Sequence, residues 1–481
     1  MTRTQGQRSL MENRERMEKV NLRLLVLELL MEVTENRNGG GTYSHIAVRD
    51  VLRKYNYLSQ QEKSFIKRLF EGTLERMITL DFVINQYSKV KTDKLKPQIR
   101  AILRMGVYQI LYMDAVPDSA ACNEAVKLAQ KKGFATLKGF VNGVLRNIAK
   151  NKDTLVYPNL SVEYSMPEWI VNLWTSQLGE EKTHAVLEGL LMEHPVTVRL
   201  RDKSVKDALQ EALAARGGKM TAHPYFGDAY QIEKTDDMTT LPFYQEGAFV
   251  VQDVSSMLAV RALLSGDFLA VKRAAGETLR IVDVCAAPGG KSILAADLLQ
   301  DMGVCRGDFR IEARDISEQK VALMQENFVR CGLDRDSVLA AVCDALACDG
   351  QQTADIVIAD VPCSGLGVIG KKRDIKYRVT QEQLAELVTL QRRILEKAVK
   401  MLKTGGRLLF STCTINRAEN EENFEWLVKE QKMTPVSFFG ALPESLRTGS
   451  VETTETAKQG YLQLLPKLHN TDGFFISVLK K

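Results

Sequence analysis

RIVDVCAAPGGK, residues 280–291, joins an apolar run to a loop of small residues, and a helical pattern follows. Small residues let backbone N–H groups approach a ligand, and the N-terminus of the following helix favours negative charge. From about residue 277 the chain repeats this strand–helix alternation. Strands are predicted at 280–285, 309–315, 338–343, 355–360 and 407–411, and helices such as 317–331 and 381–402 lie between them. This rhythm predicts a doubly wound, Rossmann-like parallel α/β sheet with helices on both faces.

Two other regions precede this α/β domain, to which we assign residues 246–481. Residues 1–155 have apolar side chains at spacings near 3.6 and no sustained strand-like alternation, which predicts an all-α domain. A turn is predicted within it at Asn38-Gly39-Gly40-Gly41. Residues 156–245 predict a small α+β RNA-binding connector, with a strand at 196–200, a helix at 204–216 and a further strand-like piece at 229–232. Within the α/β domain, the pair Gly405-Gly406 is interpreted as the end of the helix at 381–402.

Composition excludes several classes of protein. Of the 481 residues, 45% are hydrophobic and 26% charged, which is typical of a soluble globular chain. No uncharged apolar run is long enough for a membrane span, and the N-terminus lacks the apolar core of a signal peptide, so we expect a cytoplasmic protein. Eight cysteines are spread thinly, without a disulfide framework or zinc-ribbon spacing, and no metal site is expected.

Positive charge is concentrated in the first third of the chain. Residues 1–150 hold 26 Lys and Arg against 15 Asp and Glu, a net charge of +11, and the remaining residues hold 39 against 45, a net charge of −6. Because phosphate contacts are electrostatic, this asymmetry favours an RNA-binding region. A solvated helical surface rich in lysine is the alternative interpretation.

Polar residues at the carboxyl ends of the predicted strands indicate a cofactor site, because ligands of open α/β sheets bind at that edge. The glycine loop follows the first strand. Asp315 ends the second strand, where a carboxylate commonly binds the ribose hydroxyls, and Asp344 follows the third and can accept from an adenine amino group. The pattern indicates an adenosine-containing cofactor. S-adenosylmethionine is favoured, and a dinucleotide is the alternative.

Two cysteines follow two other predicted strands. The strand at 355–360 ends in Asp360-Val361-Pro362-Cys363, and the strand at 407–411 ends in Ser411-Thr412-Cys413. A structural cysteine is more often placed inside a strand or helix. Two cysteines at strand ends on the cofactor side, beside Asp360, favour a catalytic role over a structural one.

These motifs together resemble the RNA 5-methylcytosine methyltransferases of the NOL1/NOP2/Sun family. The resemblance is carried by DVCAAPGGK at 283–291, DVPCSG at 360–365 and STCT at 411–414, supported by QDVSS at 252–256 and DGFF at 472–475. The helical N-terminal region resembles an RNA-binding domain of the NusB type, so the resemblance covers nearly the whole chain. It implies a methyltransferase domain at 246–481 that uses S-adenosylmethionine, with 16S ribosomal RNA as the substrate of an enzyme expected to be monomeric.

The family's chemistry assigns roles to individual residues. Carbon 5 of cytosine is a poor nucleophile, and adding a thiolate to carbon 6 makes it enamine-like. By resemblance, Cys413 is that nucleophile, Asp360 bonds the base, and Cys363 assists release of the adduct. The implied cofactor-binding residues are Cys285, Ala286, Ala287, Pro288, Gly289, Gly290, Lys291, Asp315, Asp344 and Asp360.

One loop departs from the family pattern. At 370–375, GKKRDI lacks a proline that the family often has, and we expect this loop to contact RNA. Two alternatives remain open: the same chemistry on tRNA, and an inactive, antitermination-like RNA-binding protein. The presence of both Cys363 and Cys413 argues against the inactive protein.

Overall fold

The computed structural model describes the chain except for residues 1–19, 36–41, 194, 236, 269–276 and 348–349, so the turn predicted at 38–41 lies outside the described residues. The chain forms two compact units. A helical unit contains residues 1–171 and Lys372–Arg378, and a second unit contains residues 172–371 and 379–481. The segment Lys372–Arg378 therefore leaves the second unit and belongs to the helical one.

The helical unit is built around α6 (Pro97–Tyr112), whose Ile99, Ile102, Leu103 and Val107 are fully buried. Other helices described in this unit are α2 (Leu22–Glu35), α3 (Ser44–Lys54), α4 (Gln60–Glu75), α5 (Met77–Tyr87), α7 (Asp118–Lys131), α8 (Lys138–Asn151), α9 (Leu160–Glu163) and α17 (Ile375–Arg378). The local sequence determines where several of these helices begin. Ser59 and Glu62 form a capping box at the start of α4, and Pro97 occupies the first turn of α6. The all-α prediction is confirmed for this region.

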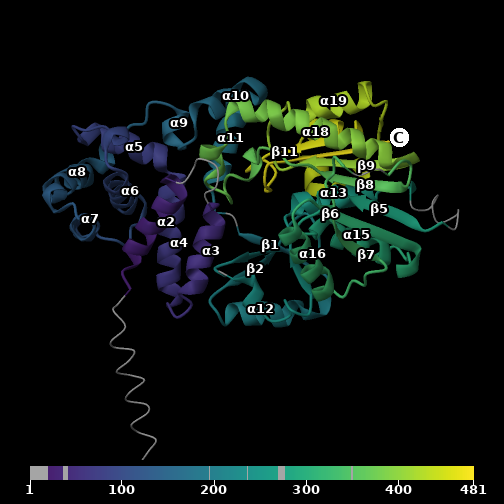
Figure 1. Ribbon diagram of the computed structural model, residues 1–481, viewed down its shortest axis with the longest axis horizontal. Coiled ribbons are helices and arrows are strands. Elements are labelled where there is room, and N and C mark those ends of the chain that lie inside the picture. Colours follow the sequence, from purple (N-terminus) through teal and green to yellow (C-terminus); the bar gives the residue numbers. More distant parts are fainter. Residues whose placement is uncertain (1–19, 36–41, 194, 236, 269–276, 348–349) are drawn as a thin grey trace, which may run out of the picture. The chain divides into compact units, whose positions relative to one another are not determined.

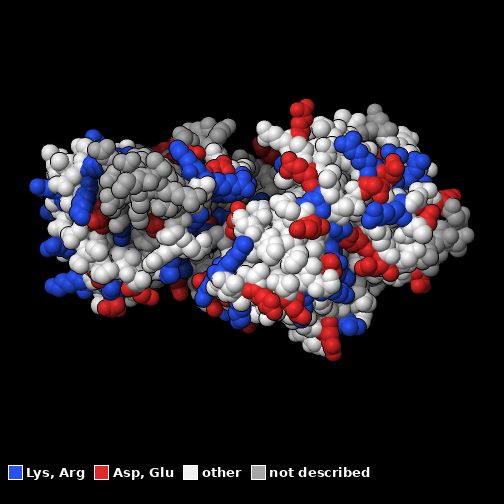
Figure 2. Space-filling model, turned by 90° about the horizontal axis from the view of Figure 1, so that it is seen from below, with Lys and Arg blue, Asp and Glu red and all other residues white. Residues whose placement is uncertain are grey.

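Several basic side chains of the helical unit face solvent. Lys127 and Lys131 on α7, and Lys138, Arg146 and Lys150 on α8, are exposed. In Figure 2, Lys and Arg side chains project along the left edge of the face shown, where the helical unit lies. The net positive charge of this part of the sequence is therefore available at the surface.

The second unit begins with helices α10 (Glu168–Leu178) and α11 (Glu180–Leu191) and a four-stranded antiparallel sheet. Its strands are β1 (Val196–Leu200), β2 (Lys219–Ala222), β3 (Ala229–Glu233) and β4 (Phe249–Val251), in the order β2-β3-β1-β4, and α12 (Lys206–Ala214) packs beside β2. The predicted strand at 196–200 coincides with β1. The prediction missed β2.

The larger sheet of the second unit has eight strands. Along it lie β10 (Thr434–Pro435), β12 (Phe474–Lys480), β9 (Leu402–Thr412), β8 (Ala354–Asp360), β5 (Leu279–Asp283), β6 (Phe309–Asp315) and β7 (Val338–Val342), and β11 (Tyr461–Leu464) pairs with β12. The five strands from β9 to β7 are parallel, and β12 is antiparallel to β9. Strand order reverses between β5 and β8, which makes their carboxyl ends the expected ligand-binding edge.

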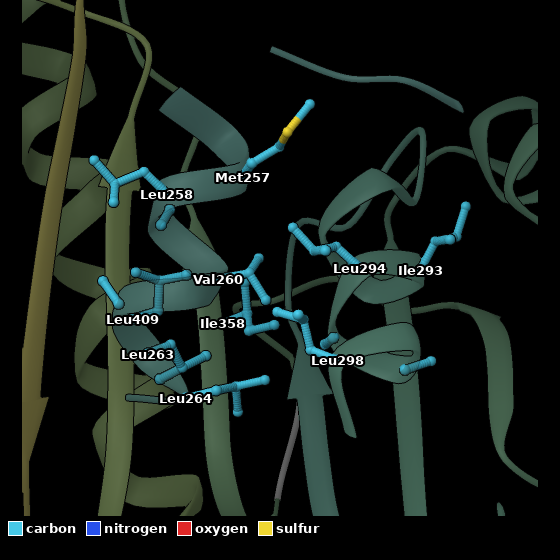
Figure 3. Packing of buried hydrophobic residues seen from close by; sticks show 14 of the residues in the cluster. Met257, Leu258, Val260, Leu263, Leu264, Ile293, Leu294, Leu298, Ile358 and Leu409 are labelled. Carbon is cyan, nitrogen blue, oxygen red and sulfur yellow. The ribbon is translucent and has the colours of Figure 1, made fainter. Parts of the chain in front are cut away.

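Alternate residues of these strands belong to two separate cores. Ile281, Ile358 and Leu409 pack against α13 (Val254–Leu263) and α15 (Gly290–Asp301). Figure 3 shows Ile358 and Leu409 beside residues of both helices. On the same side lies α16 (Glu318–Arg330), whereas α18 (Gln381–Met401) and α19 (Glu421–Lys429) cover the opposite face (Figure 1). The doubly wound α/β prediction is confirmed.

The helix predicted at 381–402 agrees with α18 to one residue, but the role predicted for Gly405-Gly406 is wrong. Helix α18 ends at Met401, and Gly405-Gly406 lie inside β9 instead of ending the helix. The pairing with β8 jumps from Ala354–Leu402 to Ile356–Arg407, so the glycines occupy a bulge, and Gly405 has φ +78°. A glycine pair marks a positive-φ position both after a helix and in a bulge, so the sequence signal was ambiguous.

Within the described part of the chain, no helix is long and apolar enough to cross a membrane. The same residues contain no cluster of three or more His, Cys, Asp or Glu side chains suited to a metal ion.

Candidate active site

The glycine loop between β5 and α15 is folded tightly against its surroundings. The Ala286 N–H donates to the Arg314 carbonyl at 2.8 Å, and the Asn327 side chain donates to the Pro288 carbonyl at 3.0 Å. Gly289 has φ +98°, and a Cβ there would lie 2.7 Å from a ring carbon of Phe328. Only glycine fits this backbone and this space, so the loop presents the N-terminus of α15 to the sheet edge.

A buried carboxyl lies beneath this loop. Asp283, at the end of β5, is 1% exposed and accepts a hydrogen bond from Ser292 Oγ at 2.8 Å. Burial raises its pKa to about 7, against the opposing effects of Ser292 and Lys291. The strand end and the first turn of α15 are thereby tied together.

Asp315 and Asp344 occupy the strand ends at which the sequence placed them. Asp315 is 7% exposed, accepts from the Ser317 N–H at 3.1 Å, and has Lys320 Nζ 3.6 Å from its second oxygen. Asp344 follows β7 and accepts from the Leu346 N–H at 2.9 Å. Ionised carboxylates only accept hydrogen bonds, and ribose hydroxyls and an adenine amino group can donate them. The donor–acceptor chemistry of these residues therefore fits an adenosine group.

Asp360, at the end of β8, is paired with a lysine of the glycine loop. Its oxygens accept from Lys291 Nζ at 2.6 Å and from Ser411 Oγ at 2.8 Å. Burial alone would lower the pKa of Lys291, but the charge and hydrogen bond of Asp360 raise it above its ordinary value. Lys291 is therefore a cation directed at Asp360, and this pairing was not predicted from the sequence.

The two cysteines meet at this same edge. Cys363 Sγ and Cys413 Sγ are 3.3 Å apart, although the residues are separated by 50 positions in the chain. The hydrogen bond with Cys413, burial and the negative charge of Glu419 all raise the pKa of Cys363 well above its ordinary value. A Cys413 thiolate, in contrast, is among the charges that raise the pKa of Lys291, so Cys413 lies within electrostatic reach of that cation.

The motifs at 252–256 and 472–475 form hydrogen bonds with the glycine loop and with the loop that follows Cys363. Gln252 donates to the Gly290 carbonyl at 3.1 Å, and Lys371 Nζ bridges Asp253 at 2.8 Å and Asp472 at 2.7 Å. The Gly473 N–H donates to the Gly367 carbonyl at 2.9 Å. The elements at 252–256 and 472–475 therefore support the loop that follows Cys363.

The loop at 370–378, for which RNA contact stays a prediction, has partners within the protein for most of its charged side chains. Arg373 donates to Glu71 and Glu75 at 2.8 and 2.9 Å, and Ser44 Oγ donates to Asp374 at 2.5 Å. Together with the Lys371 bridge, these bonds occupy most of the loop's charged side chains within the protein, and Lys372 is exposed. Sequence reasoning could not foresee these acidic partners, because they lie about 300 residues away.

A second set of residues was missed. Glu419 and Asn420 follow Cys413 closely and are fully buried, with their side chains bonded to both cysteine loops. The run RAENEEN at 417–423 is rich in charged and amide side chains, which usually indicates a solvated helix start. Its position directly after the Cys413 motif was the available signal.

The chain matches two known families. Residues 269–480 match the family described as 16S rRNA methyltransferase RsmB/F, and residues 20–150 match the NusB family. The probable ribosomal RNA small subunit methyltransferase B of Bacillus subtilis (strain 168) is 33% identical over 97% of this chain and 100% of its own length. The corresponding protein of Synechocystis sp. is 30% identical over 94% and 99%.

Solved structures share the fold. The crystal structure of PH0851 superposes with a TM-score of 0.72 at 22% identity, covering 96% of this chain and 100% of that chain. The structure of NSun6 from Pyrococcus horikoshii with SFG has a TM-score of 0.52 at 21% identity, covering 66% of this chain and 98% of that chain.

The doubly wound sheet, its strand-end site and these matches define a methyltransferase of the RsmB/F class with a NusB-family domain. More particularly, the chain belongs to the family of ribosomal RNA small subunit methyltransferase B, whose members it matches along nearly its whole length. The resemblance inferred from the motifs is confirmed.

Proposed function

We propose that this protein methylates carbon 5 of a cytosine in 16S ribosomal RNA through a covalent adduct with Cys413. The observation that carries the proposal is the pair of cysteine sulfurs 3.3 Å apart beside Asp360, at the edge of the sheet where ligands bind. The names of the family and of its curated relatives support the methyl-transfer reaction and the ribosomal substrate.

The cofactor we propose is S-adenosylmethionine, whose sulfonium supplies the methyl group. Asp315 would hold the ribose hydroxyls and Asp344 the adenine amino group, and the glycine loop from Cys285 to Lys291 would approach the remainder of the cofactor. Support comes from the acceptor character of the two carboxylates and from the close-packed backbone at Gly289. NSun6, a structural neighbour, was solved with SFG, an analogue of this cofactor.

The surrounding charges support different roles for the two cysteines. Cys413 lies within reach of the Lys291 cation, which favours a thiolate, and Cys363 lies near the Glu419 carboxylate, which favours a thiol. The Cys413 thiolate adds to carbon 6 of the base, and the electron pair displaced to carbon 5 takes the methyl group. Asp360, oriented by Lys291 and Ser411, would accept a hydrogen bond from the exocyclic amine and, once ring nitrogen 3 carries a proton in the adduct, from that nitrogen as well.

Completion of the reaction requires two changes at the methylated adduct. A solvent water or hydroxide takes the proton from carbon 5, the electron pair of that C–H bond forms the double bond between carbons 5 and 6, and the bond from carbon 6 to Cys413 breaks with its electron pair returning to that sulfur. Cys363, 3.3 Å from Cys413 Sγ, is placed to assist this elimination. The two cysteines thus act before and after methyl transfer.

The two cysteine variants test the mechanism. Cys413→Ala should abolish methylation and leave RNA binding largely intact. Cys363→Ala should still form the adduct and release it slowly, giving a protein–RNA species stable to denaturant on a denaturing gel. Appearance of the stable adduct with Cys413→Ala alone would reverse the roles, and unchanged methylation by both variants would refute the covalent mechanism. Bisulfite sequencing of ribosomal RNA and tRNA from a deletion strain identifies the substrate, and a lost signal only in tRNA would overturn the ribosomal assignment.

The helical domain, residues 1–155, is proposed to bind RNA through phosphates. Exposed lysines and arginines on α7 and α8 support this role. Charge reversal of Lys138 and Arg146 in the full chain should weaken RNA binding and reduce its salt dependence by about one ion per lost phosphate contact. Unchanged affinity and salt slope would assign the basic surface another role.

A further inference from the structure

Glu419 lies at the centre of a hydrogen-bond network between the two cysteine loops. It precedes α19 and is fully buried. One carboxylate oxygen accepts from the Ser364 N–H at 2.9 Å and from Gln391 Nε2 at 2.9 Å. The other accepts from Ser364 Oγ at 2.5 Å and from Asn416 Nδ2 at 3.1 Å. This second oxygen also accepts a longer hydrogen bond from Thr414 Oγ1 at 3.5 Å, so each oxygen accepts at least two hydrogen bonds, the arrangement that suits an ionised carboxylate.

The donors to Glu419 belong to the two catalytic loops. Ser364 directly follows Cys363, and Asn416 lies three residues after Cys413. The two loops are also joined directly, since Ser364 Oγ and Thr414 Oγ1 are 2.7 Å apart. One buried charge therefore holds residues adjoining both cysteines.

A side chain on α18 also joins this hydrogen-bond network around Glu419. Gln391, on α18, donates both to Glu419 and to the carbonyl of Pro362, the residue before Cys363, at 2.9 Å each. Asn423 Nδ2 donates to Gln391 Oε1 at 2.9 Å, which sets the orientation of that amide. The Cys363 loop is therefore bonded on both sides of the cysteine.

Asn420, the residue after Glu419, forms hydrogen bonds with the residues on either side of Cys413. Thr412 Oγ1 donates to Asn420 Oδ1, and Asn420 Nδ2 donates to the Thr414 carbonyl at 3.1 Å. Cys413 is thus flanked by two residues bonded to one buried amide. Glu419 and Asn420 together leave neither cysteine loop free to move independently.

We propose that Glu419 is a positioning residue that holds Cys363 and Cys413 at reacting distance from each other and from one base. The inference rests on the covalent mechanism proposed above, because the spacing of the thiols matters only if both act on one base. Glu419 also keeps a negative charge near Cys363, which favours the thiol form of that residue. It contacts neither the glycine loop nor Asp315 among the hydrogen bonds of the described residues, so it should act on turnover and not on cofactor affinity.

The test compares Glu419→Gln with Glu422→Gln, which changes an exposed carboxylate three residues further along the chain. Glutamine is nearly isosteric, but its NH2 group would face donors in place of an acceptor. We expect kcat for methyl transfer to fall about 100-fold in Glu419→Gln, with the affinity for S-adenosylmethionine within about threefold of wild type, because small misplacements of reacting groups cost about this much. Glu422→Gln should behave as wild type.

A second measurement does not depend on methylation. Dibromobimane becomes fluorescent when two neighbouring thiolates each displace one bromide, and mass spectrometry of the bridged peptides locates the link. Bridging of Cys363 to Cys413 should be about tenfold slower in Glu419→Gln than in wild type or Glu422→Gln. Ser364→Ala, which removes only one donor, should give a smaller loss in both assays and guards against a fold defect in Glu419→Gln.

The outcomes separate the two proposals. Slower bridging with lost turnover supports the positioning role. Unchanged bridging and turnover in Glu419→Gln overturn it, as does a loss of cofactor affinity equal to the loss of turnover. If the wild type forms no 5-methylcytosine but bridging still depends on Glu419, the proposed function fails and Glu419 still positions the thiols.

Discussion

Lys376 should make the stability of the helical unit depend on pH. Its side chain is 1% exposed, and its ammonium donates to the carbonyls of Glu75 at 2.8 Å and Ser165 at 2.7 Å. Burial lowers its pKa from 10.5 to about 7, although the charge of Glu75 opposes the change. The folded protein therefore releases this proton far more easily than the unfolded chain does.

The sign and size of the effect follow from linkage. Between pH 7 and 10.5 the unfolded chain binds more protons at Lys376 than the folded protein, so the free energy of unfolding rises with pH in this window. Each pH unit contributes about 1.4 kcal/mol when the unfolded lysine is charged and the folded one neutral. Because the folded lysine is about half protonated at pH 7, the gain from pH 7 to pH 9 is about 2 kcal/mol.

The effect is measured by urea denaturation of the full chain, followed by far-ultraviolet circular dichroism, for wild type and Lys376→Met. The difference in unfolding free energy, wild type minus variant, should rise by about 2 kcal/mol from pH 7 to pH 9. Lys372→Met, at an exposed position of the same segment, should show no such rise. A pH-independent difference for Lys376→Met would show that Lys376 is solvated and that Lys372–Arg378 is not packed in the helical unit.

Three further variants test the candidate active site. Gly289→Ala places a methyl group against Phe328 in a positive-φ backbone, so it should cost about 1–2 kcal/mol of stability and weaken the binding of S-adenosylmethionine. If calorimetry gives an unchanged affinity for S-adenosylmethionine, the loop is not part of the cofactor site. Asp315→Ala should lower cofactor affinity by about 1.5–3 kcal/mol without changing RNA affinity; equal affinity for the cofactor would exclude Asp315. Lys291→Met should slow alkylation of Cys413 by iodoacetamide at pH 7 about tenfold, because a nearby cation is lost; an unchanged rate would mean that Lys291 does not stabilise the thiolate.

Much of the α/β fold could be predicted because strand and helix patterns there are strong and local. The predicted strand at 309–315 coincides with β6, and the strand at 355–360 differs from β8 by one residue. The error at Gly405-Gly406 arose where one signal fits two structures. The edge strand β10 has only two residues, which is too short to show an alternation of apolar and polar side chains in the sequence.

The residues of the candidate site were easier to predict than their partners. Parallel strands bring their carboxyl ends to one edge, so Asp315, Asp360, Cys363 and Cys413 could be placed together from the sequence. Contacts set by tertiary packing could not. Lysine side chains are usually exposed, and only the folded structure shows that Lys376 is buried.

Under the proposed mechanism, the charges of Lys291 and Glu419 favour different protonation states of the two cysteines. Each thiol follows a strand of the same sheet, and their sulfurs are in contact, so geometry alone does not distinguish them. A Cys413 thiolate is among the charges that act on Lys291, the charge of Glu419 acts on Cys363, and opposite charges shift a thiol equilibrium in opposite directions. If Cys413 is the nucleophile, Lys291→Met and Glu419→Gln should therefore impair different steps: the first should slow adduct formation, and the second should also slow its resolution. Quenched time courses of the denaturant-stable adduct separate the two, and identical time courses for both variants would show that charge does not assign the roles.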